Sequence, residues 1–183
     1  MRITWSLCLH ALKEVILLRS LFLQSLFFIT AFILLSSLRE MSMLSKDTVI
    51  ENNSVAEGIK YQTTTGELRS VSASGKTTIL YFFAPWCQIC HASISNLQSV
   101  FENNAHIDVI AIALDFSSEK AVYNFISQHQ LTFPVVFGTE QLKQQYAITA
   151  YPSYYVLDMN NKITARSLGY STELGLYLRT LTL

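Results

Sequence analysis

Two cysteines three positions apart, Cys87 and Cys90, are the residues of this chain best suited to do chemistry. The unbroken apolar run 79–83 precedes them and Pro85 follows it, which is typical of a buried strand that ends in a turn. From Cys90 onward, apolar residues recur every three or four positions, which predicts a helix over 87–103 that begins at the cysteines. Residues three apart at a helix start are close enough for a disulfide. The pattern therefore predicts a dithiol that cycles between thiol and disulfide.

The helix start gives the two cysteines different roles. Unpaired N–H groups and the helix dipole favour negative charge there, so Cys87 should lose its proton more easily than a free thiol. The thiolate is the species that attacks disulfides. Cys90 lies further into the first turn, beneath Trp86 and Cys87. We therefore expect Cys87 to be the nucleophile and Cys90 the resolving cysteine.

Other interpretations of the same stretch are possible. Residues 87–91 also match the C-x-x-C-H motif of c-type haem attachment, with Met159 as a conceivable second axial ligand. The preceding strand and the Pro-Trp turn favour a redox dithiol instead. A zinc site needs about four ligands, and a second cysteine pair is absent. The remaining histidines show no ligand spacing: His10, His106 and His129. A static disulfide would gain little from so short a loop. We expect neither metal nor cofactor.

The whole chain has 183 residues and a formal net charge of zero, which gives no reason to expect a nucleic-acid partner. Its length allows one domain with an accessory segment. Half of the residues are hydrophobic (50%), and the excess is concentrated at the N-terminus. The third cysteine, Cys8, lies outside the expected domain.

An uncharged apolar stretch at 21–38 is long enough to span most of a ~30 Å hydrocarbon core as a helix. Positive residues precede it, so the positive-inside rule places 1–20 in the cytoplasm or at the membrane surface and the rest of the chain outside. A cleaved signal peptide is the competing interpretation. The long preceding segment and the lack of a clear A-x-A site favour an uncleaved anchor. The sequence thus predicts a single-pass inner-membrane protein with its catalytic domain in the periplasm.

A polar linker at 39–57 should lead to one folded domain at 58–183. Strands and helices alternate there, which implies an α/β sheet covered on both faces. In the last helix Leu174, Leu178 and Leu181 are in register along one face. Besides helix 87–103, the pattern predicts a hairpin at 59–63 and 68–71, strands at 77–83, 107–114, 133–137, 153–157 and 162–168, and helices beginning at 117–119, over 140–146 and over 172–181.

The domain resembles the thioredoxin-fold family, and within it the membrane-anchored TlpA/ResA-like thiol–disulfide oxidoreductases. The resemblance rests on four stretches: 83–90 (Phe-Ala-Pro-Trp-Cys-Gln-Ile-Cys), Phe133–Pro134, Tyr151–Pro152 and 157–162.

This resemblance implies a central mixed sheet with helices on both faces, after an N-terminal transmembrane helix. It also implies that Pro152 is cis and packs against the dithiol, with Trp86, Tyr151 and Pro152 binding the substrate. The implied partners are disulfide-containing protein substrates and a membrane electron-donor protein.

The sequence departs from this family at three positions. Tyr81 stands where many thioredoxins have a buried acid, and Ser93 and Ser95 stand where many TlpA-like proteins have glutamate and proline. A carboxylate near the resolving cysteine would help to move its proton. The sequence leaves open which group moves this proton in the present chain. The resemblance favours a protein-disulfide reductase. An oxidant or isomerase, or a thioredoxin scaffold that binds a partner without turnover, remain alternatives.

Overall fold

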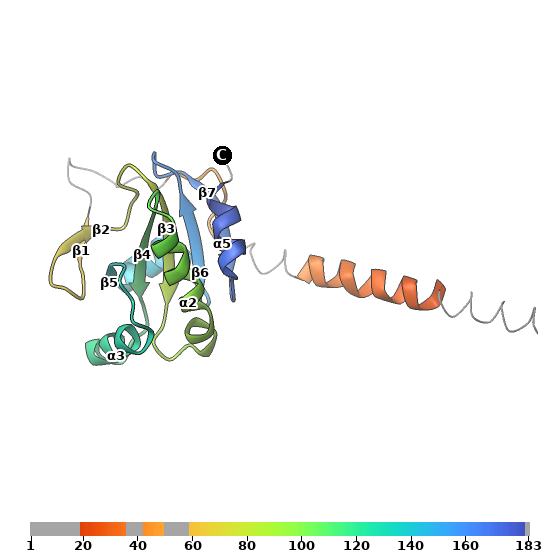
Figure 1. Cartoon of the computed structure of the whole chain (residues 1–183), viewed down its shortest axis with the longest axis horizontal. Helices are drawn as coiled ribbons and strands as arrows, with labels where there is room; N and C mark the ends of the chain where they lie inside the picture. Colours follow the sequence, from red (N-terminus) through yellow and green to blue (C-terminus); the bar gives the residue numbers. More distant parts are fainter. Residues whose placement is uncertain (1–18, 36–41, 50–58, 182–183) are drawn as a thin grey trace, which may run out of the picture. The chain divides into compact units, whose positions relative to one another are not determined.

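The computed structural model describes residues 19–35, 42–49 and 59–181 (Figure 1). Contacts divide the chain into two units, Met1–Arg39 and Glu40–Leu183. In the first unit, residues 19–35 form a helix whose large apolar side chains are mostly exposed. Among the described residues, none of the helices combines the length and hydropathy that a membrane crossing requires. The predicted anchor at 21–38 extends past residue 35, so its last part lies outside the described residues, as do residues 1–18.

The second unit is built on a five-stranded mixed sheet in the order β5-β4-β3-β6-β7 (Figure 1). Strands β3, β4 and β5 are parallel to one another, and β6 and β7 join antiparallel on the other side of β3. A separate antiparallel hairpin, β1–β2, precedes the sheet. The strands are β1 Lys60–Gln62, β2 Leu68–Ser70, β3 Thr77–Phe83, β4 Ile107–Ala113, β5 Val135–Phe137, β6 Ser153–Leu157 and β7 Ile163–Leu168.

Within the described residues of this unit, four helices connect and cover the strands, and side chains cap their starts. Ser118, Thr139 and Thr172 each accept a hydrogen bond from the backbone N–H three residues ahead, which satisfies an otherwise unpaired donor. The helices are α2 Gln88–Asn103, α3 Glu119–His129, α4 Glu140–Gln145 and α5 Glu173–Thr180. These bounds agree closely with the elements predicted from the sequence.

Alternate residues of the central strand β3 supply two hydrophobic cores. Ile79, Tyr81 and Phe83 point to the face that α2, α3 and α5 cover. Leu80 and Phe82 point to the opposite face, where α4 packs. All five side chains are completely buried. The predicted α/β domain, with helices on both faces of a mixed sheet, is therefore confirmed.

The structure places part of the predicted linker on the domain itself. Met43 is buried in the second core, and the Leu44 N–H donates to the Tyr155 hydroxyl at 2.9 Å. Arg166 donates to the backbone carbonyls of both residues, at 3.0 and 2.6 Å. Residues 42–49, which the sequence assigned to the linker, thus pack against β6 and β7.

The register of α5 differs from the expected one. Leu174, Leu178 and Leu181, which the sequence placed along one apolar face, are 65%, 53% and 50% exposed, whereas Leu176 is completely buried. Leucines occur on both sides of this helix, so its own periodicity does not decide which side faces inward. Contacts with α2 and β7 decide it.

Candidate active site

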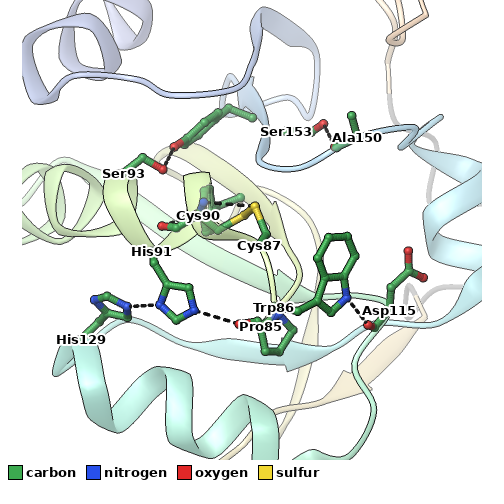
Figure 2. Close-up of a disulfide and its surroundings, with 12 residues drawn as sticks. Pro85, Trp86, Cys87, Cys90, His91, Ser93, Asp115, His129, Ala150 and Ser153 are labelled. Carbon is green, nitrogen blue, oxygen red and sulfur yellow. Dashed lines mark hydrogen bonds between the residues drawn. A yellow bond between two sulfur atoms is a disulfide. The ribbon is translucent and has the colours of Figure 1, made fainter.

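The two cysteines lie where β3 runs into α2. Cys87 is the N-cap residue of α2, and its sulfur accepts a hydrogen bond from the Cys90 N–H at 3.1 Å. The two residues form a disulfide with a Cα–Cα distance of 5.2 Å (Figure 2). The disulfide therefore sits at the positive end of the helix dipole, as the spacing predicted.

The two sulfurs differ in accessibility. Cys87 is 6% exposed, whereas Cys90 is completely buried. A thiol or disulfide from another molecule can therefore reach this pair only through Cys87. The Cys90 side chain belongs to the same core as Tyr81 and Tyr154.

An aromatic pair begins at Trp86, the residue directly before Cys87. Trp86 is 62% exposed, and its ring meets that of Tyr151 edge-on, with centroids 5.9 Å apart. The Tyr151–Pro152 peptide bond is cis, and Pro152 is buried. The structure thus brings Tyr151 against Trp86, the sequence neighbour of Cys87, although the two aromatic residues lie far apart in the sequence.

Asp115 connects these aromatic residues, and the sequence analysis missed it. Its carbonyl accepts from the Trp86 indole at 2.8 Å, and its carboxylate accepts from the Tyr151 hydroxyl at 2.9 Å and from Lys143 Nζ at 2.7 Å (Figure 2 shows the Trp86 contact). Asp115 has a positive φ of 47°, a conformation that Asp tolerates better than most residues.

The pKa shifts of Asp115 and Tyr151 agree with these hydrogen bonds. The hydrogen bond from Lys143 holds the pKa of Asp115 below its usual value. Burial and the hydrogen bond to Asp115 raise the pKa of Tyr151 well above its usual value, so its hydroxyl stays a donor at neutral pH. One sequence signal could have indicated Asp115: it follows the carboxyl end of β4, next to the end of β3, where parallel strands bring functional residues together.

Two histidines, His91 and His129, lie on the side of Pro85 away from the Trp86–Asp115 contact (Figure 2). His91 Nε2 is 2.9 Å from the Pro85 carbonyl, and His91 Nδ1 is 2.7 Å from His129 Nε2. A carbonyl only accepts, so neutral His91 carries its proton on Nε2 and accepts at Nδ1 from His129. Burial, and then the neighbouring His91, lower the pKa of His129. The pair joins the first turn of α2 to the end of α3, a contact that no pattern in the sequence indicates.

The residues that depart from the family pattern occupy different places. Tyr81 and Ser93 are completely buried beside Cys90, whereas Ser95 is exposed. Met159, considered above as a haem ligand, is 66% exposed after β6. Among the residues that the structure describes, no group of three or more metal-binding side chains gathers.

A mixed sheet of this order, with a Cys-x-x-Cys disulfide at the start of a helix and a cis-proline, is the arrangement of a thioredoxin-like thiol–disulfide oxidoreductase. The model of the AhpC/TSA family matches residues 53–166. The chain belongs to the AhpC/TSA family.

Several individual proteins are also similar to this chain. The thioredoxin-like protein YneN of Bacillus subtilis (strain 168) is 28% identical over 133 residues, which are 70% of this chain and 78% of YneN. A thiol-disulfide oxidoreductase ResA of Bacillus cereus is 30% identical over 113 residues, 59% of this chain and 65% of ResA. The crystal structure of StoA from Bacillus subtilis superposes with a TM-score of 0.60 at 26% identity, covering 66% of this chain and 94% of StoA.

Proposed function

We propose that this protein is a membrane-anchored, periplasm-facing thiol–disulfide oxidoreductase that reduces disulfides of protein substrates through Cys87 and Cys90. The observation that carries the proposal is the disulfide at the N-cap of α2, with one sulfur partly accessible and the other buried. Relatives named thiol-disulfide oxidoreductases, among them ResA, support the same chemistry.

The unequal burial of the two sulfurs supports the following order of steps. The reduced Cys87 thiolate, which the helix dipole and the Cys90 N–H stabilise, attacks a substrate disulfide and forms a mixed disulfide. Cys90 then attacks the Cys87 sulfur, which releases the reduced substrate and restores the Cys87–Cys90 disulfide. We expect Trp86, which directly precedes Cys87, and the Tyr151–Pro152 pair, whose tyrosine ring meets Trp86, to bind the substrate chain. A reductase in an oxidising compartment also needs electrons, so we infer a membrane electron-donor protein as the second partner.

The reduction potential of the Cys87–Cys90 pair tests the direction of electron flow. We expect a value close to the about −270 mV of thioredoxin, together with reduction of insulin by the dithiol form. The potential is read from the ratio of oxidised to reduced protein in glutathione or dithiothreitol buffers of set composition. A value near −120 mV would instead identify an oxidant. A chain that reduces no disulfide at all would be a binding module, and the proposal would be wrong.

The N-terminal segment supports the anchor. The helix over 19–35 exposes Leu, Phe and Ile side chains along its length, and such a surface needs apolar surroundings. The positive residues before it favour a cytoplasmic N-terminus. Alkaline phosphatase fused after Leu183 should therefore be active, because that enzyme matures only outside the cytoplasm. An inactive fusion, with an active cytoplasmic reporter at the same point, would contradict this topology.

The contact between Tyr151 and Asp115 should affect substrate binding more than chemistry. Tyr151→Phe keeps the ring but removes the hydroxyl that donates to Asp115. A hydrogen bond to a charged group contributes at most about 1.5–3 kcal/mol, and less when it is exposed. The freed Tyr151 ring must be ordered again when substrate binds, so we expect KM for a disulfide-containing peptide to rise by up to about 10-fold, with kcat little changed. Steady-state kinetics measure both constants. Tyr123→Phe is the matched control, since its hydroxyl bonds the Thr64 carbonyl near the β1–β2 hairpin. A KM for Tyr151→Phe equal to that of the control would refute the role of this contact.

A further inference from the structure

Three hydroxyl groups lie in the interior next to Cys90. The Tyr81 hydroxyl donates to the Cys90 carbonyl oxygen at 3.4 Å, and the Tyr154 hydroxyl donates to Ser93 Oγ at 3.2 Å (Figure 2 draws the Ser93 contact). Tyr81 and Tyr154 are register partners on β3 and β6, with ring centroids 4.9 Å apart. Ser93 lies one helical turn after Cys90, on the same face of α2. We call Tyr81, Ser93 and Tyr154 the hydroxyl cluster.

The hydroxyl cluster places three polar side chains in the interior around Cys90. All three residues are completely buried. The buried side chains in the described part of the chain include no Asp or Glu, and α2 has no acid in its first turn. From the elements packed around the cluster, the charged or titratable groups that act on Tyr154 are Arg179 of α5 and Tyr170. A carboxylate base for Cys90 is therefore missing from the described surroundings.

The hydroxyls remain donors at neutral pH. Burial, and then the neighbouring phenol of Tyr154, raise the pKa of Tyr81 well above its usual value, and burial raises the pKa of Tyr154 to about 12. Neither phenol can thus act as a base for Cys90. A buried thiolate is costly without donors, and donors to the charged form offset that cost. The bond from Tyr81 to the Cys90 carbonyl is long, so this hydroxyl loses little when it rotates toward a better acceptor.

We propose that Tyr81, Ser93 and Tyr154 are positioning residues for the resolving cysteine: they hold the first turn of α2 and stabilise the Cys90 thiolate by hydrogen bonding. This inference rests on the proposed function of the Cys87–Cys90 pair. It assigns to neutral donors the part that a carboxylate would otherwise play near the resolving cysteine.

The chemical step balances within the protein and its substrate. In the mixed disulfide, the electron pair of the Cys90 thiolate forms a bond to Cys87 Sγ. The bond between Cys87 Sγ and the substrate sulfur breaks, and its electron pair leaves with the substrate sulfur, which takes up the proton that Cys90 released. Cys87 and Cys90 are oxidised and the substrate disulfide is reduced. In the other half of the cycle, a donor thiolate attacks Cys87 and Cys90 leaves as the thiolate that the cluster stabilises.

The pH dependence of this step can be followed with the aromatic disulfide dithiobis(nitrobenzoate). Attack by Cys87 on this probe releases a first thionitrobenzoate, and attack by Cys90 on the resulting mixed disulfide releases a second. Stopped-flow absorbance of the reduced full-length chain, in a Cys8→Ser background, gives both rates at each pH. The midpoint, which is the pH at which the rate of the second release is half-maximal, reports the ionisation of the Cys90 thiol.

We expect Tyr81→Phe and Tyr154→Phe, which remove only a hydroxyl, to raise this midpoint by about one pH unit and to slow the second release about 10-fold at pH 7. Ser93→Ala should shift the midpoint in the same direction, and it replaces a tyrosine variant that does not fold as the test of the hydroxyl cluster. The first release should not change. Tyr146→Phe is the matched control, because this buried tyrosine bonds the Val71 carbonyl in the opposite core.

The possible outcomes separate the two proposals. An unchanged midpoint in the folded cluster variants, or an equal shift in Tyr146→Phe, would overturn the role of the hydroxyl cluster while leaving the dithiol function intact. If the unmodified chain gave no second release, the proposed function would fail, and the cluster proposal with it.

Discussion

Replacing Cys90 with serine should make the protein accumulate as mixed disulfides with its natural partners. Cys87 would still attack a substrate disulfide, but the thiol that normally releases the substrate would be missing. Cys87→Ser should trap far less, because the remaining Cys90 sulfur is completely buried and lies inside the helix rather than at its start. Non-reducing gels of membranes from cells making each variant measure the trapped species, and mass spectrometry identifies them.

The matched control for trapping is Cys8→Ser, alone and combined with Cys90→Ser. Cys8 lies outside the domain, so its removal should change nothing, and any adduct that disappears with it was not formed at the active site. Equal trapping by Cys87→Ser and Cys90→Ser would contradict the assignment of nucleophile and resolving cysteine. Trapped proteins with reducible disulfides would identify the substrates, and a trapped membrane protein would be the candidate electron donor.

Two leucines of α5 should differ sharply in their effect on stability. Leu176 is completely buried in the core that also contains Cys90, whereas Leu178 is 53% exposed. We expect Leu176→Ala to lower the free energy of unfolding by about 2–5 kcal/mol, because it leaves a cavity. Leu178→Ala should change it by no more than about 0.5 kcal/mol, as is usual for surface positions.

Urea unfolding of the oxidised chain, followed by circular dichroism, measures this difference. Both variants replace leucine by alanine in the same helix, so helix propensity cancels from the comparison. A larger loss for Leu178→Ala would restore the register expected from the sequence, with Leu174, Leu178 and Leu181 facing inward. It would also contradict the packing of α5 against α2 and β7.

The chemistry of the site was predictable because its signals are local. The apolar run of β3, the proline after it and the helical spacing after Cys90 lie within one short stretch, and each follows from backbone preferences or side-chain periodicity. The same holds for the order of strands and helices and for their bounds. Short turns and clear changes of period mark those bounds along the domain.

The surroundings of the disulfide were not predictable in this way. His91 and His129 are 38 residues apart, Asp115 and Tyr151 are 36 apart, and Ser93 and Tyr154 are 61 apart. Local backbone preferences and side-chain periodicity do not predict such contacts, because each contact depends on how a strand or helix from elsewhere in the chain packs beside the site. Residues 42–49 illustrate the same limit: their polar composition is that of a linker, yet Arg166 and Tyr155 bind their backbone.

The sequence by itself therefore determined the reactive pair, its place at a helix start and the α/β order of the domain. The tertiary structure decided which side of α5 faces inward and which groups surround the resolving thiol. The physical reason is that helix and strand formation depend on neighbours along the chain, whereas burial and polar contacts depend on neighbours in space. At Cys90 those spatial neighbours are hydroxyls in place of a carboxylate.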